Sequence, residues 1–149
     1  MAGHPFVKQY EPEKHVLAIT TYRRISPKDA RELLVHLRGR KALDALKLLD
    51  LVIKKKYAVP FKRYTEGAAH KTGNIAGGRY PVNAAKEIKN LINSLIKNAE
   101  YKGFDADAVY IKYVAVSRAA TFHRPRRSRF RGQKAKSTHL YVLGEVREK

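Results

Sequence analysis

The chain lacks cysteine, and it has few acidic residues for its number of basic ones. Its 149 residues include no Cys, 32 Lys and Arg, and 13 Asp and Glu, which gives a formal net charge of +19. Without cysteine the chain can form no disulfide and no cysteine-based metal or redox site, which fits an intracellular location. The excess of positive charge favours a polyanionic partner, above all nucleic acid, because phosphate contacts release counterions.

Long apolar runs are also missing. No stretch approaches the ~18–20 apolar residues that a membrane-spanning helix needs, and the first residues do not have the pattern of a signal peptide. The hydrophobic share is nevertheless an ordinary 44%. A modest core is therefore expected, and we predict one domain over residues 1–149 with no membrane segment.

Motifs for catalysis and metal binding are absent as well. The histidines stand at positions 4, 15, 36, 70, 123 and 139, so there is no His-x-x-x-His pair, and no Cys completes a ligand set. The glycines at 73, 77 and 78 do not form the phosphate-loop motif G-x-x-x-x-G-K-[ST]. We expect His36 to be a partly buried histidine at the edge of the core, and Asp105 and Asp107 to make local backbone bonds in a turn. No enzymatic activity, cofactor or metal is predicted.

Acidic residues are missing altogether between Asp107 and Glu145. The centre of this window, from Arg118 to Lys136, holds six Arg and two Lys, and strand-like segments at 109–116 and 140–146 flank it. We interpret 109–146 as two strands and a long protruding basic β-hairpin, each side of which could reach about 50 Å. Its turn is expected between Pro125 and Gly132. A disordered basic loop is the alternative.

Arginine rather than lysine dominates the centre of this hairpin, and two aromatic residues, Phe122 and Phe130, lie among the cations. Guanidinium groups bind phosphate bidentately, and both guanidinium and aromatic planes stack on unpaired bases. So many like charges would repel one another in an isolated hairpin. We infer that an external polyanion neutralises them.

The rest of the chain predicts a small α+β body. Residues 1–14 show no period and are expected to form a loosely held arm, and 15–24 is a strand candidate. Ser26, Pro27 and Asp29 are typical of a helix start, and Gly39 ends that helix. The segment 57–80 breaks every period and is predicted to be a long loop that is either functional or ordered by a partner.

Two further helices are expected on either side of that loop. The first carries the apolar stripe Leu43, Leu46, Leu49, Val52 and Ile53, and Ala42 and Ala45 are expected to allow close approach to a neighbouring element. It closes at Lys54–Lys56, where cations suit a helix C-terminus. The second runs from Pro81 to about Tyr101, with a stripe from Ala84 to Ala99. The fold class is therefore α+β, a small antiparallel three-stranded sheet packed by three helices, with the hairpin protruding.

Several short segments carry a family resemblance when they are taken in order. They are I-S-P-K-D-A-R at 25–31, L-R-G-R at 37–40, A-L at 45–46, N-A-E at 98–100, D-A-D at 105–107, R-P-R at 124–126 and S-T-H-L at 137–140. The set resembles the universal large-subunit ribosomal protein numbered twenty-two, called seventeen in the eukaryotic count. The insertion at 57–80, with V-P-F-K-R-Y, is similar to the archaeal and eukaryotic branch.

The resemblance implies a structural constituent of the large subunit of the cytoplasmic ribosome, with rRNA and neighbouring ribosomal proteins as partners. It implies a body near the exit of the polypeptide tunnel and a hairpin whose tip lines the tunnel wall, beside the nascent polypeptide. Bacterial members commonly show a tighter P-R-x-x-G-R arrangement, whereas six residues separate Pro125 from Gly132 in this chain.

The predicted RNA-binding residues are cations of the body and of the hairpin, together with the two aromatic residues and one histidine. They are Lys28, Arg38, Arg40, Lys54, Lys55, Lys56, Lys62, Arg63, Arg79, Arg118, Phe122, His123, Arg124, Arg126, Arg127, Arg129, Phe130, Arg131, Lys134 and Lys136. The tunnel-lining tip that the resemblance implies comprises Arg124, Pro125, Arg126, Arg127, Ser128, Arg129, Phe130, Arg131 and Gly132. The alternative function is a general, chromatin-type nucleic-acid packaging protein, which would bind duplex DNA of any sequence at least as well as rRNA. A small basic enzyme acting on RNA is a third possibility.

Overall fold

The fold is known from a computed structural model, which describes residues 5–6, 10–73, 75–125, 129 and 132–147. Its elements, in chain order, are β1 (His15–Arg23), α1 (Pro27–Leu37), α2 (Ala42–Ile53), β2 (Val59–Pro60), β3 (Gly78–Arg79), α3 (Val82–Tyr101), the 3-10 turn η2 (Ala106–Ala108), β4 (Val109–Arg118), β5 (Phe122–His123), β6 (Lys134–Ala135) and β7 (Thr138–Val146). Within the described residues, no helix is long and apolar enough to cross a membrane.

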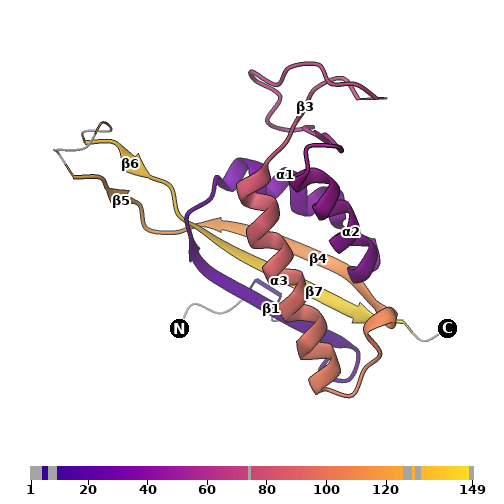
Figure 1. The fold of residues 1–149 in the computed structure, drawn as a ribbon. Helices are drawn as coiled ribbons and strands as arrows, with labels where there is room; N and C mark the ends of the chain where they lie inside the picture. Colours follow the sequence, from indigo (N-terminus) through magenta and orange to yellow (C-terminus); the bar gives the residue numbers. More distant parts are fainter. Residues whose placement is uncertain (1–4, 7–9, 74, 126–128, 130–131, 148–149) are drawn as a thin grey trace.

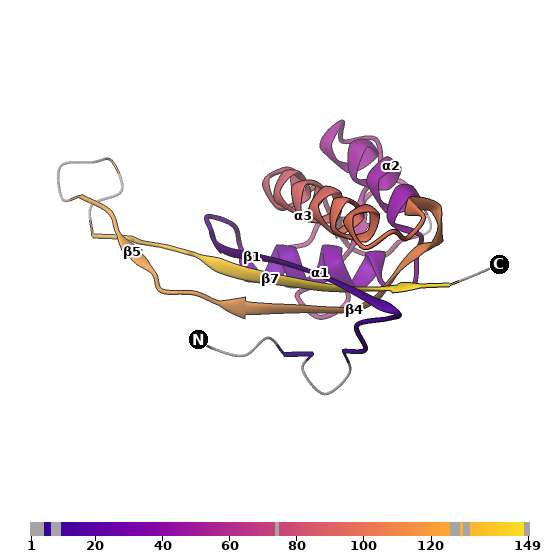
Figure 2. The same ribbon diagram turned by 90° about the horizontal axis from the view of Figure 1, so that it is seen from below.

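The main sheet contains three strands in the order β1-β7-β4, and both pairings are antiparallel. The central strand β7 pairs Leu143 with Leu17 of β1 and with Tyr113 of β4. α1, α2 and α3 lie over one face of this sheet (Figures 1 and 2). The predicted α+β architecture, with a three-stranded antiparallel sheet and three helices, is confirmed.

The hydrophobic core fills the space between the helices and that face of the sheet. Its largest fully buried side chains come from α1, α2 and α3, together with Val16 of β1, Ile111 of β4 and Leu140 of β7. The predicted stripe of α3 is confirmed in full, because Ala84, Ala85, Ile88, Leu91, Ile92, Leu95, Ile96 and Ala99 are all buried. Burial of these side chains is the main term that stabilises the body.

The first helix begins and ends as its sequence predicts. The Ser26 side chain accepts a hydrogen bond from the Asp29 N–H at 3.5 Å, and Pro27 occupies the first helical turn. The last residue of α1 is Leu37, and Gly39 follows with a φ of +84°, which side chains disfavour. The Gly39 N–H donates to the Ile111 carbonyl at 2.7 Å, which fixes the end of α1 against β4.

The buried side of α2 confirms part of the predicted stripe. Leu49 and Val52 are completely buried, whereas Leu43, Leu46 and Ile53 are only partly buried. Ala42 and Ala45 are also completely buried, as expected of small side chains that permit close packing against a neighbouring element. Leu48, which the predicted stripe omits, is buried as well.

The segment 57–80 has more structure than the predicted loop. Its ends pair as the antiparallel strands β2 and β3, and Val59 and Phe61 are buried in the core. The carboxylate of Glu32 on α1 accepts hydrogen bonds from the backbone N–H groups of Lys62 at 3.0 Å and Arg63 at 3.3 Å. A buried acid on a helix thus anchors this segment to the body.

The connection between β4 and β7 is an arm of residues 119–137 that extends beyond the sheet (Figures 1 and 2). Backbone hydrogen bonds cross the arm from Ala119 to Ser137 at 3.0 Å and from Arg124 to Gln133 at 3.1 Å, and β5 pairs with β6 between them. Gly132 has a φ of +66°, as expected near a turn. Residues 126–128 and 130–131 lie outside the described residues, so the full extent of the hairpin stays a prediction.

The residues before β1 are tied to the body more firmly than the expected loose arm. The Lys102 ammonium, just after α3, donates hydrogen bonds to the Tyr10 hydroxyl at 2.9 Å and to the carbonyls of Pro12 at 3.2 Å and His15 at 3.0 Å. Phe6 is buried, and its ring stacks near that of Tyr113 with 6.2 Å between centroids. These contacts hold the described part of 5–14 against the sheet and the end of α3.

Candidate nucleic-acid interface

Three neighbouring cavities bring many of the predicted RNA-binding residues to one end of the protein, around the start of α1 and the base of the arm. We name them the arm-base cavity, the Tyr64 cavity and the Arg118 cavity, with volumes of about 620, 670 and 330 Å³. Lys136 lines all three. We call this surface the basic end, and its lysines and arginines are Arg24, Lys28, Arg63, Arg79, Arg118, Arg124, Lys134 and Lys136.

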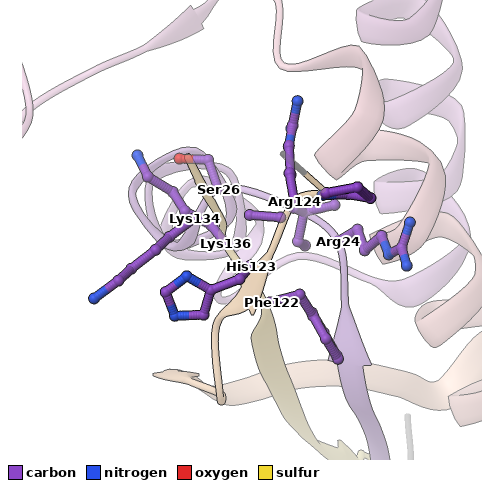
Figure 3. Close-up of a pocket in the computed structure, with 10 residues that line it drawn as sticks. Arg24, Ser26, Phe122, His123, Arg124, Lys134 and Lys136 are labelled. Carbon is purple, nitrogen blue, oxygen red and sulfur yellow. The ribbon is translucent and has the colours of Figure 1, made fainter. Parts of the chain in front are cut away.

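The arm-base cavity lies between the arm and the segment that joins β1 to α1 (Figure 3). β5 contributes Phe122 and His123 to its wall, and the chain between β1 and α1 contributes Arg24. The Arg24 guanidinium lies 5.7 Å from the centroid of the Phe122 ring, a cation–π distance. The cavity therefore combines an exposed aromatic ring with several positive charges.

The Tyr64 cavity lies beside the anchored segment 57–80. Three cations surround the Tyr64 ring, with Lys28 at 5.2 Å, Arg63 at 5.8 Å and Arg31 at 6.0 Å from its centroid. Arg79 lies in the same cavity and donates a hydrogen bond to the Glu66 carbonyl at 2.7 Å. The ring and the Glu32 anchor thus hold cations from α1 and from segment 57–80 close together.

The Arg118 cavity lies on the arm where β4 ends. Arg118 lines it together with Lys134 and Lys136, all three of which are exposed, and with Lys28 from α1. No Asp or Glu lines this cavity. Four cations, from α1, β4, β6 and the chain just after β6, therefore line the same cavity without an acidic residue among them.

Carboxylates neutralise a different set of cations. Ion pairs join Arg23 to Glu87 at 3.3 Å, Lys89 to Asp50 at 2.6 Å, and both Lys112 and Arg147 to Glu145. Within the part of the chain that the structure describes, no carboxylate forms an ion pair with Lys28, Arg63, Arg79, Arg118, Lys134 or Lys136. The acids of the described residues therefore leave these six cations available to an external anion.

The acid at the end of β7 shows the strength of the internal pairing. A hydrogen bond from Lys112 lowers the pKa of Glu145 below its usual value, and Arg147 lowers it further, while burial opposes both. Because the sheet places Lys112 on β4 beside β7, this charge pair belongs to the body. We therefore assign Lys112 to the fold and not to the interface.

Several predicted RNA-binding residues lie away from the basic end. Arg38 and Arg40 follow the C-terminal end of α1, roughly 15 Å along the helix from Lys28. The Arg38 Nε donates to the Lys112 carbonyl at 3.1 Å, and the Arg40 Nε donates to the His36 carbonyl at 3.3 Å. Lys54–Lys56 are exposed where α2 ends, and Lys62 is exposed after β2. These residues form separate basic positions on the body.

The predicted tip is described only in part. Arg129 and Gly132 are exposed, and Arg124 and Pro125 line the arm-base cavity. The predicted residues Arg126, Arg127, Ser128, Phe130 and Arg131 lie outside the described residues. Their predicted roles stay predictions.

Sequence reasoning misses two residues of the basic end, Arg24 and Tyr64. Arg24 reads only as the end of a strand, although it stands two residues before the helix start at Ser26. Its role depends on a long-range contact, because the chain after β1 lies beside Phe122 at the base of the arm. Tyr64 stands among cations in the V-P-F-K-R-Y segment, and that interleaving of an aromatic residue with basic residues was the available signal.

The histidine prediction for α1 is confirmed. His36 is partly buried, and its Nε2 lies 2.9 Å from the Tyr57 hydroxyl. Burial lowers the pKa of His36 below its ordinary value of 6.5, and the nearby charges of Arg40 and Lys62 lower it further. Among the described residues, no group of three His, Asp or Glu could hold a metal ion.

The fold and this surface define a small, strongly basic α+β protein with a cationic arm between two paired strands. The family model for ribosomal protein L22p/L17e matches residues 18–142. The large ribosomal subunit protein uL22 of Methanococcoides burtonii is 34% identical over 151 residues, covering 99% of this chain and 100% of that protein. The uL22 of Ignicoccus hospitalis is 37% identical, and the match covers 93% of this chain and 92% of that protein. The uL22 of Cenarchaeum symbiosum is 42% identical, and the match covers 73% of this chain and 72% of that protein.

The match covers most of this chain, from β1 through the arm to β7. The chain therefore belongs to the ribosomal protein L22p/L17e family, and these three relatives are archaeal, as the segment at 57–80 predicted. It is accordingly a structural, non-enzymatic protein of the translation machinery.

Proposed function

We propose that this protein is a structural constituent of the large ribosomal subunit in the cytoplasm and that it binds rRNA through the basic end. The observation that carries the proposal is a set of six cations around three adjoining cavities that form no ion pair with a carboxylate of the described residues, namely Lys28, Arg63, Arg79, Arg118, Lys134 and Lys136. Family membership supplies the setting, since the relatives are large-subunit proteins by name. Phosphates would neutralise the charges that the protein's own acids leave unpaired.

The body and the arm would act as one rRNA-binding domain over residues 1–149. The cations of the basic end would contact phosphates where the arm leaves the body, while Arg38, Arg40, Lys54–Lys56 and Lys62 would add contacts elsewhere. Neighbouring ribosomal proteins would cover part of the remaining surface. Among the arm residues, Arg129 and the other predicted tip residues would approach the polypeptide tunnel.

We further propose that the globular body lies near the tunnel exit and that the arm lines the tunnel wall beside the nascent polypeptide. The projection of the arm away from the helices supports this arrangement (Figure 2). The family resemblance also supports this location. A photo-crosslinker at position 129 should capture a stalled nascent chain in the assembled ribosome, whereas the same probe at position 97, on the exposed side of α3, should not. Equal capture at both positions would refute the tunnel assignment.

A competition experiment separates this function from that of a general packaging protein. The full-length chain is bound to a large-subunit rRNA fragment and challenged with duplex DNA of the same length, at several salt concentrations. A ribosomal role predicts that the folded rRNA competes at least about tenfold better than the DNA, because its shape positions phosphates around the cavities. Equal competition at every salt concentration would favour the packaging protein.

A further inference from the structure

The arm-base cavity differs in composition from the other hollows of the protein. It is lined by Lys, Arg and His together with an exposed aromatic ring, and by no Asp or Glu. The Tyr64 cavity contains Asp29 and Glu66, and a cavity near η2 contains Asp105 and Asp107. The Arg118 cavity is also free of acids, but it has no aromatic residue. In contrast to these three cavities, the arm-base cavity pairs an aromatic surface with an acid-free positive wall.

The aromatic surface is the ring of Phe122. It is 45% exposed, although phenylalanine is usually buried, and it sits on a two-residue strand outside the main core. Ile25, which is 5% exposed, and Ala135 add further apolar wall. An exposed aromatic ring in a hollow is not needed for folding of the body. It is suited to a flat, apolar ligand.

Positive charge surrounds this apolar wall. Arg24 lies on the β1 side, and Lys134 and Lys136 lie on the β6 side (Figure 3). The neighbouring Arg118 cavity shares both of these lysines, so the charge continues from one hollow into the next. A ligand with a flat ring and flanking phosphates matches this arrangement, since the ring can meet Phe122 while the phosphates meet the cations.

The volume also suits a single unit of such a ligand. At about 620 Å³ the arm-base cavity lies within the roughly 300–1,000 Å³ that small-molecule sites occupy. A paired helix cannot enter it with a base, because its bases are stacked inside the duplex. A bulged or looped-out nucleotide can insert its base into the cavity, since that base is already unstacked.

We propose that the arm-base cavity receives one unstacked RNA nucleotide, whose base stacks on Phe122 and whose phosphates contact Arg24, Lys134 and Lys136. The Arg118 cavity then takes the phosphate of the adjoining nucleotide. This inference rests on the proposed rRNA-binding function and adds that the protein recognises an extruded base at this position. Stacking tolerates any of the four bases, so the site selects an RNA shape and not a base identity.

The test compares RNA hairpins that contain one unpaired nucleotide with a fully paired hairpin of the same stem. Each of the four bases is used in turn as the bulge, and binding of the full-length chain is measured at fixed salt. The proposal predicts that the bulged hairpins bind about 5- to 150-fold more tightly than the paired one, the range for one base–aromatic stack. The variant Phe122→Ala should lose this preference, and Phe122→Tyr, which keeps the ring, should retain it.

Two controls make the outcomes distinct. Tyr101→Ala removes a ring that is 94% exposed on α3 and should leave the preference unchanged. Circular dichroism should show the same helical signal for all variants, because Phe122 lies outside the main core. Equal binding of bulged and paired hairpins by the unmodified chain, or an unchanged preference in Phe122→Ala, would overturn the nucleotide site but leave rRNA binding intact. Failure of the proposed function would instead appear as equal competition by duplex DNA.

Discussion

The anchor at Glu32 offers a sharp test of how segment 57–80 is held. Its side chain is only 3% exposed and accepts two backbone hydrogen bonds, from Lys62 and Arg63, as well as one from Arg31 at 3.3 Å. Glu32→Gln replaces one of the two carboxylate oxygens with an NH₂ group, which cannot accept a hydrogen bond from the backbone N–H that faces it. The remaining oxygen still accepts a hydrogen bond, but it no longer carries a negative charge. Hydrogen bonds to charged groups contribute about 1.5–3 kcal/mol each, and water can reach the exposed residues 62 and 63 after the change.

We therefore expect Glu32→Gln to lower the free energy of unfolding by about 2 kcal/mol. For a chain of this size that corresponds to a fall in melting temperature of roughly 4–8 °C. Hydrogen exchange at the amides of Lys62 and Arg63 should accelerate more than exchange in α3. The matched control is Glu66→Gln, which makes the same chemical change at an exposed acid of the same segment and should leave stability within about 0.5 kcal/mol of the unmodified chain.

The reasoning would be refuted if Glu32→Gln and Glu66→Gln unfolded at the same temperature and the two amides exchanged no faster. In that case Val59 and Phe61, which are buried, would hold the segment without help from the carboxylate. A loss of stability without faster exchange at Lys62 and Arg63 would place the role of Glu32 in α1 itself.

Two further predictions concern the body. Burial holds the pKa of His36 below 6.5 in the folded chain. The neutral side chain therefore makes its full contribution to stability above pH 6.5. That contribution is lost as the pH falls further, because the unfolded chain binds the proton more readily than the folded chain. Urea midpoints of the unmodified chain should therefore drop more between about pH 7.5 and pH 5.5 than those of His36→Gln, and equal drops would contradict this. Lys102→Gln should lower unfolding free energy by about 1–2 kcal/mol and speed amide exchange before β1, because the shorter side chain cannot reach the Pro12 and His15 carbonyls. Lys97→Gln, an exposed change on α3, is its control, and equal effects of the two would count against the anchor.

The sequence predicted α3 residue by residue because its apolar positions follow one helical period without interruption. It predicted the limits of α1 because Ser26, Pro27 and Gly39 each impose a local backbone preference. It predicted close packing at Ala42 and Ala45 of α2, but it counted Leu43, Leu46 and Ile53 in the buried stripe, where they are only partly buried, and it omitted Leu48. Periodicity alone does not show how deeply each apolar side chain of a helix packs against its neighbours.

The sequence indicated which basic residues could bind an anion, but it did not indicate which of them lie close together in the fold. The missing acids between Asp107 and Glu145 identified the arm, and the body cations followed from composition. Which of them converge depends on long-range contacts, above all the Glu32 anchor and the contact of Arg24 with Phe122 at the base of the arm. Neither contact has a sequence signature, since an acid on a helix ordinarily faces solvent. Arg38 and Arg40 lie apart from Lys28 because α1 separates them.

The salt dependence of rRNA binding tests the central claim most directly. The variant with Arg118→Ala, Lys134→Ala and Lys136→Ala removes exposed charges of the basic end, and a control variant with Lys47→Ala, Lys86→Ala and Lys97→Ala removes the same number of charges from α2 and α3. Each lost phosphate contact reduces the slope of log K against log salt by about 0.7–0.9. The basic-end variant should therefore show a slope shallower by about 2, with the control unchanged. An equal reduction in both variants would mean that total charge, and not this surface, binds the RNA.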